Sequence, residues 1–519
     1  MAATYRLTID WDDDGVYEAG EEVTGDLLTW SFGRQFSNRM ARTAQVGRAT
    51  FLMHNPISTY TPAANPSARP MLRIRFSMTV GGTEKHLFTG RILDYVPQPG
   101  WGWRRCALQC ADLVYLLQGN EIAAPVQLHA RVDEIIEAII TSAGYASTKS
   151  TLSEPGIGTT PISADRWDFA YTSFLLRPSR EPNLNAYNGI AQAALSEWGR
   201  WFVDGAGEWR YYNRHHRAFG EDTDYTLYDN PPSFAPQRYM TGVSFKNSVE
   251  TVKNDVRVNY YPRTVGTVDE VLARISPGAP LSVDPGASRV VTLTYRDPSG
   301  SSAQVGALAV TPISAPWDIA ATYERTGDGP SAIADLSWSA TYTANKTTIT
   351  LTNASATQIV WVHRLQVTGL IVRNREVQQA ITEDGTSQTL YRRRQLPVNS
   401  SLISQEFQAR RLGQFLINQL RNPQQEIQAL TLNARQGDDM AAIIRDLELL
   451  DTLTVQHDLG AISTNVVVAG LAHSGDRQRG HRLSLTLEPL LVYRNDAGAA
   501  ITNPFRIGDT FNSGRVMVY

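Results

Sequence analysis

The sequence predicts a mainly β, multidomain protein with one α+β unit and an inserted β-sandwich. Three observations support this fold class. The chain has 519 residues, and a chain of this length usually divides into about three or four domains. Short runs rich in Val, Thr, Tyr and Ile, separated by Gly, Pro and Asn, recur along most of it. Apolar residues at helical spacing are confined to a few segments.

Residues 1–117 are predicted to form strands. Runs such as TYRLTIDW and HLFTGRILDYV alternate or stay apolar over the length of a strand. VGGT at 80–83 supplies the paired glycines of a tight hairpin. Several short strands at this spacing predict a small sandwich or barrel.

Residues 118–235 are predicted to form an α+β unit. The segment ARVDEIIEAIITSAG places apolar residues on one helical face and closes with Gly144 as its C-terminal glycine. A second helix is expected over 184–198, ended by Gly199. A hairpin with a Gly-rich turn is expected over 200–215.

The remaining chain is predicted to be a β-rich unit interrupted by an insertion. The β-only stretch 266–372 predicts a sandwich inserted within the unit that brackets it, 236–265 and 373–494. That unit carries a long helix over 401–422, stopped by a proline. Residues 495–519 are expected to be a C-terminal extension.

Composition and charge exclude several classes of protein. A formal net charge of −3 argues against an electrostatic nucleic-acid binder. No run of about 18 apolar residues predicts a membrane span, and the N-terminal residues lack the pattern of a signal peptide. Cys106 and Cys110, four apart on a predicted strand, lie about 13 Å apart, too far for a disulfide. They are expected to be buried free thiols of a protein made in a reducing cytoplasm.

No catalytic residues are predicted, and the chain is not expected to be an enzyme. It contains no G-x-S-x-G, H-E-x-x-H or P-loop motif. The adjacent His215 and His216 would point to opposite faces of a strand and would make a poor metal pair. The basic run 392–394 is interpreted as a charged strand edge, with a phosphate contact as the alternative.

The sharpest local pattern is DWDDDGVYEAGE, residues 10–21, which fits the calcium-loop pattern D-x-[DN]-x-[DN]-G-x5-E. The side chains of Asp10, Asp12, Asp14 and Glu21, with the carbonyl of Val16, would be the oxygen ligands that Ca²⁺ prefers. The flanking segments are strand-like, whereas an EF-hand needs helices. The alternative is a hairpin turn whose carboxylates accept hydrogen bonds from local backbone amides. Ca²⁺ is the one cofactor considered, and none is certain.

With these elements in place, the N-terminal third resembles siphophage tail-tip proteins, minor tail or baseplate-hub proteins related in fold to the hub of contractile-tailed phages. Later segments, ALSEWGRWFVDGAGEWRYYNR, NDVRVNYYPR and FQARRLGQFLINQLRNP, are similar in the same order, so the resemblance covers most of residues 4–490. The N-terminal positions that carry it are Gly47, Asn55, Tyr60, Pro62, Phe88 and Gly90.

The resemblance implies a homotrimeric structural hub at the tail tip of the virion, assembled in the host cytoplasm. Two β-barrel-like hub domains per chain, 1–117 and 236–265 with 373–494, would form a pseudo-hexameric ring that continues the tail tube. The implied partners are the distal tail protein, the tape-measure protein and a tip fibre or spike. The hub would close the tube and open for ejection, and genomic DNA would pass through the lumen without specific binding.

Two departures from the minimal hub define the alternative function. Only a short segment follows the last strand block, so no wall-degrading domain is expected there. The insert 266–372 is additional, and it is either a lectin-like decoration with Trp317, Trp338 and Trp361 as sugar platforms or a sandwich with these residues in its core. The alternative function is a calcium-dependent receptor- or glycan-binding adhesin.

Overall fold

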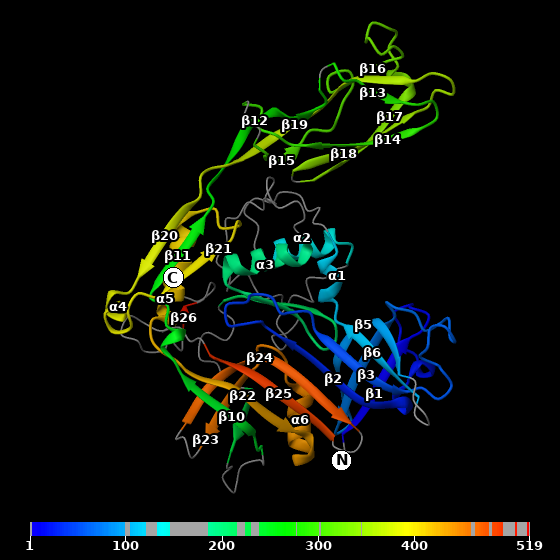
Figure 1. The fold of residues 1–519 in the computed structure, drawn as a ribbon. Helices are drawn as coiled ribbons and strands as arrows, with labels where there is room; N and C mark the ends of the chain where they lie inside the picture. Colours follow the sequence, from blue (N-terminus) through cyan, green and yellow to red (C-terminus); the bar gives the residue numbers. More distant parts are fainter. Residues whose placement is uncertain are drawn as a thin grey trace.

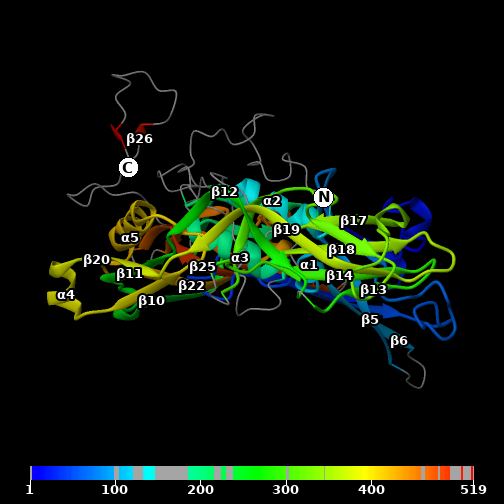
Figure 2. The same cartoon turned by 90° about the horizontal axis from the view of Figure 1, so that it is seen from above.

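The described chain forms three tiers: a large sheet, a middle tier of helices with a small sheet, and an insert carried on a long pair of strands (Figure 1). Viewed from above, the tiers fall within one slab (Figure 2). The computed structural model describes residues 3–98, 104–120, 132–145, 185–214, 224–229, 238–276, 278–299, 303–343, 345–457, 462–476, 480–490, 504–505 and 516–517.

The large sheet has 12 strands and contains strands from both the N-terminal and the C-terminal parts of the chain. Its N-terminal group is β1 (Thr4–Asp10), β2 (Leu27–Gln35), β3 (Arg48–His54), β4 (Arg73–Val80), β5 (Thr83–Gln98) and β6 (Arg105–Ala111). Its C-terminal group is β22 (Gln425–Asn433), β23 (Thr452–His457), β24 (Ile462–Asp476) and β25 (Gly480–Pro489), with β9 (Tyr225–Tyr228) and β10 (Thr241–Asn247). The order is β1-β4-β5-β6-β3-β2-β24-β25-β22-β10, and β23 links β24 to β9.

The two strand groups are joined by β2 and β24. Residues 29–35 pair antiparallel with residues 470–476, and one hydrophobic core contains buried residues of both groups. Strand periodicity explains this core, since alternate residues of β25, His481, Leu483, Leu485 and Leu487, are buried. Helix α6 (Asp438–Asp446) packs against β4 and β5 of the N-terminal group as well as against β22.

The middle tier contains α1 (Val114–Gln118), α2 (Val132–Ser142), α3 (Ala186–Glu197) and the hairpin β7 (Arg200–Val203) and β8 (Trp209–Tyr212). The apolar face predicted for α2 is buried, and Gly144 follows it at φ +85° as predicted. The prediction that Gly199 ends α3 was wrong: the left-handed residue is Trp198, at φ 61°. Gly199 is required for another reason, because a Cβ there would lie 2.3 Å from the Tyr211 hydroxyl.

A small sheet lies beside these helices. It consists of β11 (Asp255–Tyr260) between β20 (Gln378–Glu383) and β21 (Gln395–Asn399), and α5 (Glu406–Leu420) packs on it. The predicted long helix is therefore present, although shorter than 401–422. Helix α4 (Gly385–Tyr391) was not predicted from the sequence; Asp384 caps it by accepting a hydrogen bond from the Ser387 amide.

The insert is an all-β sandwich, as predicted. The long antiparallel pair β12 (Arg263–Arg274) and β19 (Val360–Asn374) carries it, and a five-stranded and a three-stranded sheet enclose its own hydrophobic core. No α-helix occurs among its described residues. The other strands are β13 (Leu281–Val283), β14 (Ser288–Thr294), β15 (Gly306–Val310), β16 (Ile319–Thr322), β17 (Leu336–Tyr342) and β18 (Lys346–Asn353).

The mainly β, multidomain class predicted from the sequence is confirmed. Within the described residues, the strand path of the large sheet does not close into a barrel. No helix in this part of the chain is long and apolar enough to cross a bilayer. The remaining short elements are η1 (Ala19–Glu21), η2 (Thr24–Asp26), η5 (Val249–Thr251), η6 (Ile333–Asp335), η7 (Ala434–Gln436), β26 (Pro504–Phe505) and β27 (Val516–Met517).

Candidate functional site

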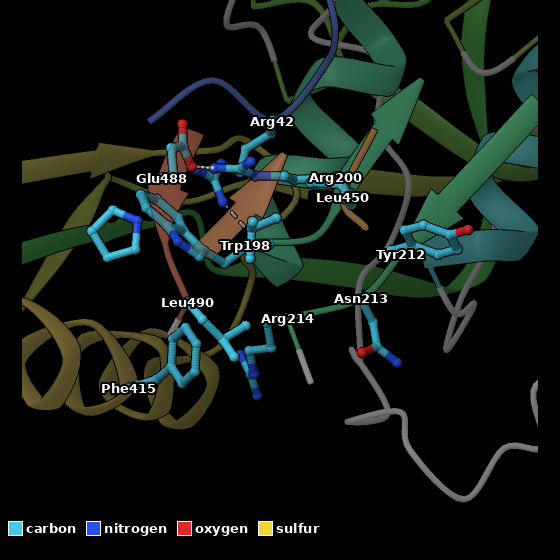
Figure 3. A pocket seen from close by; sticks show the side chains of 12 residues that line it. Arg42, Trp198, Arg200, Tyr212, Asn213, Arg214, Phe415, Leu450, Glu488 and Leu490 are labelled. Atoms are coloured by element: carbon cyan, nitrogen blue, oxygen red, sulfur yellow. Dashed lines mark hydrogen bonds and ion pairs between the residues drawn. The ribbon is translucent and has the colours of Figure 1, made fainter. Parts of the chain in front are cut away.

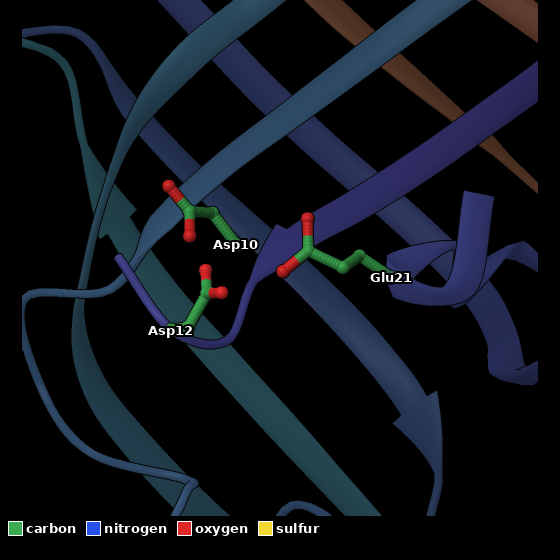
Figure 4. A group of neighbouring side chains, drawn as sticks. All are labelled: Asp10, Asp12 and Glu21. Carbon is green, nitrogen blue, oxygen red and sulfur yellow. The ribbon is translucent and has the colours of Figure 1, made fainter. Parts of the chain in front are cut away.

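The acidic loop brings three of its five predicted ligands together. Asp10 ends β1, Glu21 ends η1, and Asp12 lies between them, so the three carboxylates face one another (Figure 4). One oxygen of each lies within 4.8 Å of the others, and among the described residues this is the one such cluster of three or more His, Cys, Asp or Glu side chains. Asp10 and Glu21 are buried, and Asp12 is exposed.

The two buried carboxylates already accept hydrogen bonds from four backbone amides. Asp10 accepts from the amides of Asp14, at 3.2 Å, and Gly15, at 2.9 Å. Glu21 accepts from Trp11 at 2.7 Å and from Glu18 at 3.0 Å. Amide donors around a buried carboxylate replace the water that it loses on folding.

Asp14 lies outside this cluster of three carboxylates. One Asp14 carboxylate oxygen accepts a hydrogen bond from the Val16 amide at 2.7 Å, and the Val16 side chain is exposed. Positive charge in the loop comes from Arg73, 3.6 Å from Asp10, and from Arg91, 2.6 Å from Asp13.

The buried carboxylates of this loop are therefore better explained as acceptors for the amides of a turn than as ligands of an ion. Binding of Ca²⁺ here stays a prediction. The roles of Asp13, Arg73 and Arg91 were not predicted from the sequence. The strand register that places Arg73 opposite Asp10 is not visible in the sequence.

The second site is a pocket where the large sheet, the middle tier and helix α5 meet (Figure 3). Its volume is about 80 Å³. The loop after β2, the end of α3, the β7–β8 hairpin, α5 and the end of β25 supply its walls. The lining residues are Arg42, Trp198, Arg200, Tyr212, Asn213, Arg214, Phe415, Leu450, Val467, Glu488, Pro489 and Leu490.

Two arginines dominate the electrostatics of this pocket. The Arg42 guanidinium lies 4.3 Å from the centre of the Trp198 ring and donates hydrogen bonds to the backbone carbonyls of Arg39, Met40 and Trp198. Burial holds the pKa of Arg42 well below its usual value. Arg200 contacts Glu488 and the Arg39 carbonyl.

These contacts tie the loop after β2 to the end of α3 and to β25. The lining residues include no Ser, Cys or His that could serve as a nucleophile or a base. The contacts of Arg42 and Arg200 are suited to holding the large sheet and the middle tier in one orientation. This pocket was not predicted from the sequence, because Arg42 and Trp198 lie far apart in the chain and no motif links them.

The cysteines and histidines singled out in the sequence provide no catalytic group among the described residues. Cys106 and Cys110 are buried and free, as predicted, and burial raises the pKa of Cys106 to about 11, so its thiol is unreactive at neutral pH. His215 and His216 lie outside the described residues. Within the predicted basic run, Arg393 is paired with Asp255 at 2.7 Å and with Glu383 at 2.8 Å.

Comparison with solved structures returns tail proteins over most of the chain. The tail protein from Neisseria meningitidis MC58 is 9% identical and matches 94% of this chain and 96% of its own, with a TM-score of 0.47. The 43 kDa tail protein of prophage MuSo2 from Shewanella oneidensis is 11% identical over 94% of this chain and 98% of its own, also with a TM-score of 0.47.

A third similar structure is the E. coli c3393 protein, described as a component of the type VI secretion system with structural similarity to the T4 tail proteins gp27 and gp5. It is 12% identical and matches 92% of this chain and 76% of its own, with a TM-score of 0.35. No protein-family model and no curated protein matches the sequence. The first two of these structures are described as tail proteins, and the third as similar to tail proteins.

Proposed function

We propose that this protein is a structural hub of a phage tail tip, present as a homotrimer at the distal end of the tail tube. The sequence resemblance motivates the proposal. The observation that carries it is the single 12-stranded sheet in which the N-terminal and C-terminal strand groups pair through β2 and β24.

A shared sheet fixes the spacing of the two strand groups. Backbone hydrogen bonds along the antiparallel pairing of β2 with β24 hold the groups together, and the common core resists a hinge between them. Three copies related by a closed three-fold axis would present six strand groups in a ring. Such a ring matches the six-fold symmetry of a tail tube.

The proposed partners follow from this position. One side of the ring would contact the distal tail protein and the tape-measure protein, and the other a fibre or spike. With 48 basic and 51 acidic residues, the chain has no excess of cations to retain DNA in a lumen. The hub would close the tube before infection and open for ejection of the genome.

The first test is the oligomeric state of the purified full-length chain. Sedimentation equilibrium is expected to give three times the chain mass of 57.4 kDa, and negative-stain images are expected to show rings with a central hole. A monomer that forms no ring when mixed with its distal tail protein would contradict the proposal.

A further inference from the structure

Trp317 is the most exposed tryptophan of the insert, with 74% of its surface accessible to solvent. The expectation that Trp317, Trp338 and Trp361 belong to the sandwich core was wrong for Trp317. Trp338 is half-buried against the core, and its indole Nε1 donates to the Ile313 carbonyl at 3.4 Å. Exposure of a whole indole forgoes the free energy that its burial would contribute.

The loop that presents Trp317 is firmly anchored. Asp318 accepts hydrogen bonds from the amide and the hydroxyl of Ser314, each at 3.1 Å, and its own amide donates to the Ser314 carbonyl at 2.8 Å. The Gln366 side chain donates to the Trp317 carbonyl at 3.4 Å and to Asp318 at 3.3 Å. The indole is therefore held in solvent by a closed turn.

The neighbouring face of β19 carries a row of polar and aromatic side chains. Ile319 pairs with Leu365, and both are buried, so the adjacent Arg364 and Gln366 face outward. Half-buried Trp361 lies between the buried Val360 and Val362, and a shift in the β16–β19 register between Val362 and Arg364 keeps it on the outward side of the strand. The Arg325 guanidinium lies 5.6 Å from the centre of the Trp361 ring. Trp361 and Gln366 are five positions apart on β19, about 16 Å.

We propose that this face, defined by Trp317, Trp361, Arg364 and Gln366, is a binding site for a polysaccharide of the bacterial cell surface. The C–H groups on one face of a pyranose ring carry partial positive charge and pack on the electron-rich face of an indole. Planar guanidinium and amide groups can each make two hydrogen bonds with neighbouring hydroxyls. The length of the row suits an oligosaccharide rather than a single sugar.

The chemistry of the face favours a saccharide over a protein partner. The core of a protein interface is a contiguous, largely apolar patch that is poor in charged residues. Here the exposed indole belongs to a loop whose carbonyls accept hydrogen bonds from Arg364 and Gln366. The insert also projects from the body at the end of the β12–β19 pair (Figure 1). The site does not depend on the proposed trimer.

The test uses the full-length chain on a printed array of bacterial capsular, lipopolysaccharide and wall polysaccharides, in buffer containing EDTA. Trp317→Ala is expected to lower the affinity for the bound polysaccharide about tenfold, while Trp317→Phe retains most of it. Val290→Ala is the matched control, because Val290 is an exposed apolar residue of the same insert. Each variant should keep the melting temperature of the parent.

Three outcomes would overturn the proposal. The first is no binding to any polysaccharide on the array. The second is binding that is unchanged in Trp317→Ala or equally weakened in Val290→Ala. The third is self-association of the chain that Trp317→Ala abolishes, which would identify the face as a contact between copies. The first two results do not bear on whether the chain assembles into a tail.

Discussion

At the residue scale, Asp10 illustrates how a carboxylate in a ligand-like position can serve the backbone instead. Asp10→Ala removes the acceptor of two amides in a fully buried position and is expected to cost about 1–3 kcal/mol of unfolding free energy. Because these bonds need no ion, the loss should be equal in calcium and in EDTA. Thermal melts in the two buffers measure it.

Asp12→Ala is the matched control for this loop. Asp12 is exposed and accepts one weak hydrogen bond of 3.4 Å, so its replacement should change the unfolding free energy by less than about 0.5 kcal/mol. A different result would establish the ion site: calcium raises the melting temperature of the parent protein, and either variant abolishes this rise.

A buried histidine pair predicts a pH dependence of stability. His473 Nδ1 and His481 Nε2 lie 2.9 Å apart, both rings are buried, and the Arg34 charge acts on His473. Burial lowers the pKa of His481 to about 4 and holds that of His473 well below its usual value. The unfolded chain therefore binds protons below about pH 6.5 that the folded chain does not.

The contribution of this pair to stability is consequently expected to fall as the pH drops from 7 towards 4, by about 2 kcal/mol for His481 at pH 5. Buried Asp112 and Asp451, whose pKa values burial raises to about 7, act in the opposite sense, so the effect of the pair is read from the change in slope that His481→Gln causes. Urea unfolding at pH 7 and pH 5 measures the slope. His481→Gln should reduce this slope, and His54→Gln should leave it unchanged. The same slope in parent and His481→Gln would show that other groups cause it.

At the element scale, the close packing of β5 on β6 depends on Gly90. A Cβ at this position would lie 2.2 Å from the Ala111 carbonyl oxygen, so Gly90→Ala must push the strands apart. We expect a loss of about 3 kcal/mol, measured by chemical unfolding. Gly20→Ala is the control, because nothing lies within 4 Å of its added Cβ. Equal stability of the two variants would contradict this account.

Elements with a strong local signal were predictable, and elements set by distant contacts were not. Helix α2 has a complete apolar face and a C-terminal glycine, and its predicted position agrees with the structure. Helix α6 was missed: its few buried residues, such as Met440 and Ile444, complete a core built mainly by β-strands. The segment that forms α1 was assigned to a strand, because Val114 and Leu117 follow an apolar strand without a break.

At the acidic loop too, the local pattern was predictable and the contacts with distant residues were not. The pattern of Asp10, Asp12 and Glu21 correctly indicated that these carboxylates meet. It did not indicate which donors they accept from, because Arg73 reaches Asp10 only through the pairing of β4 with β1. Likewise, no sequence pattern links Arg42 to Trp198.

At the scale of the whole molecule, the insert has a core separate from that of the large sheet. Val265 and Val372 oppose each other in β12 and β19, so replacing 266–371 by Asn-Gly closes the pair with a tight turn. We expect the shortened chain to fold and to form the same oligomer. Circular dichroism and sedimentation measure this, and loss of the oligomer would place the insert within the assembly contacts.

The position of the protein in a virion tests the central claim most directly. Tailed particles from the source culture are labelled with gold-conjugated antibody against this chain and imaged by electron microscopy. The account predicts gold at the end of the tail farthest from the capsid. Gold at the capsid or along the tube, or absence of the protein from purified particles, would contradict it.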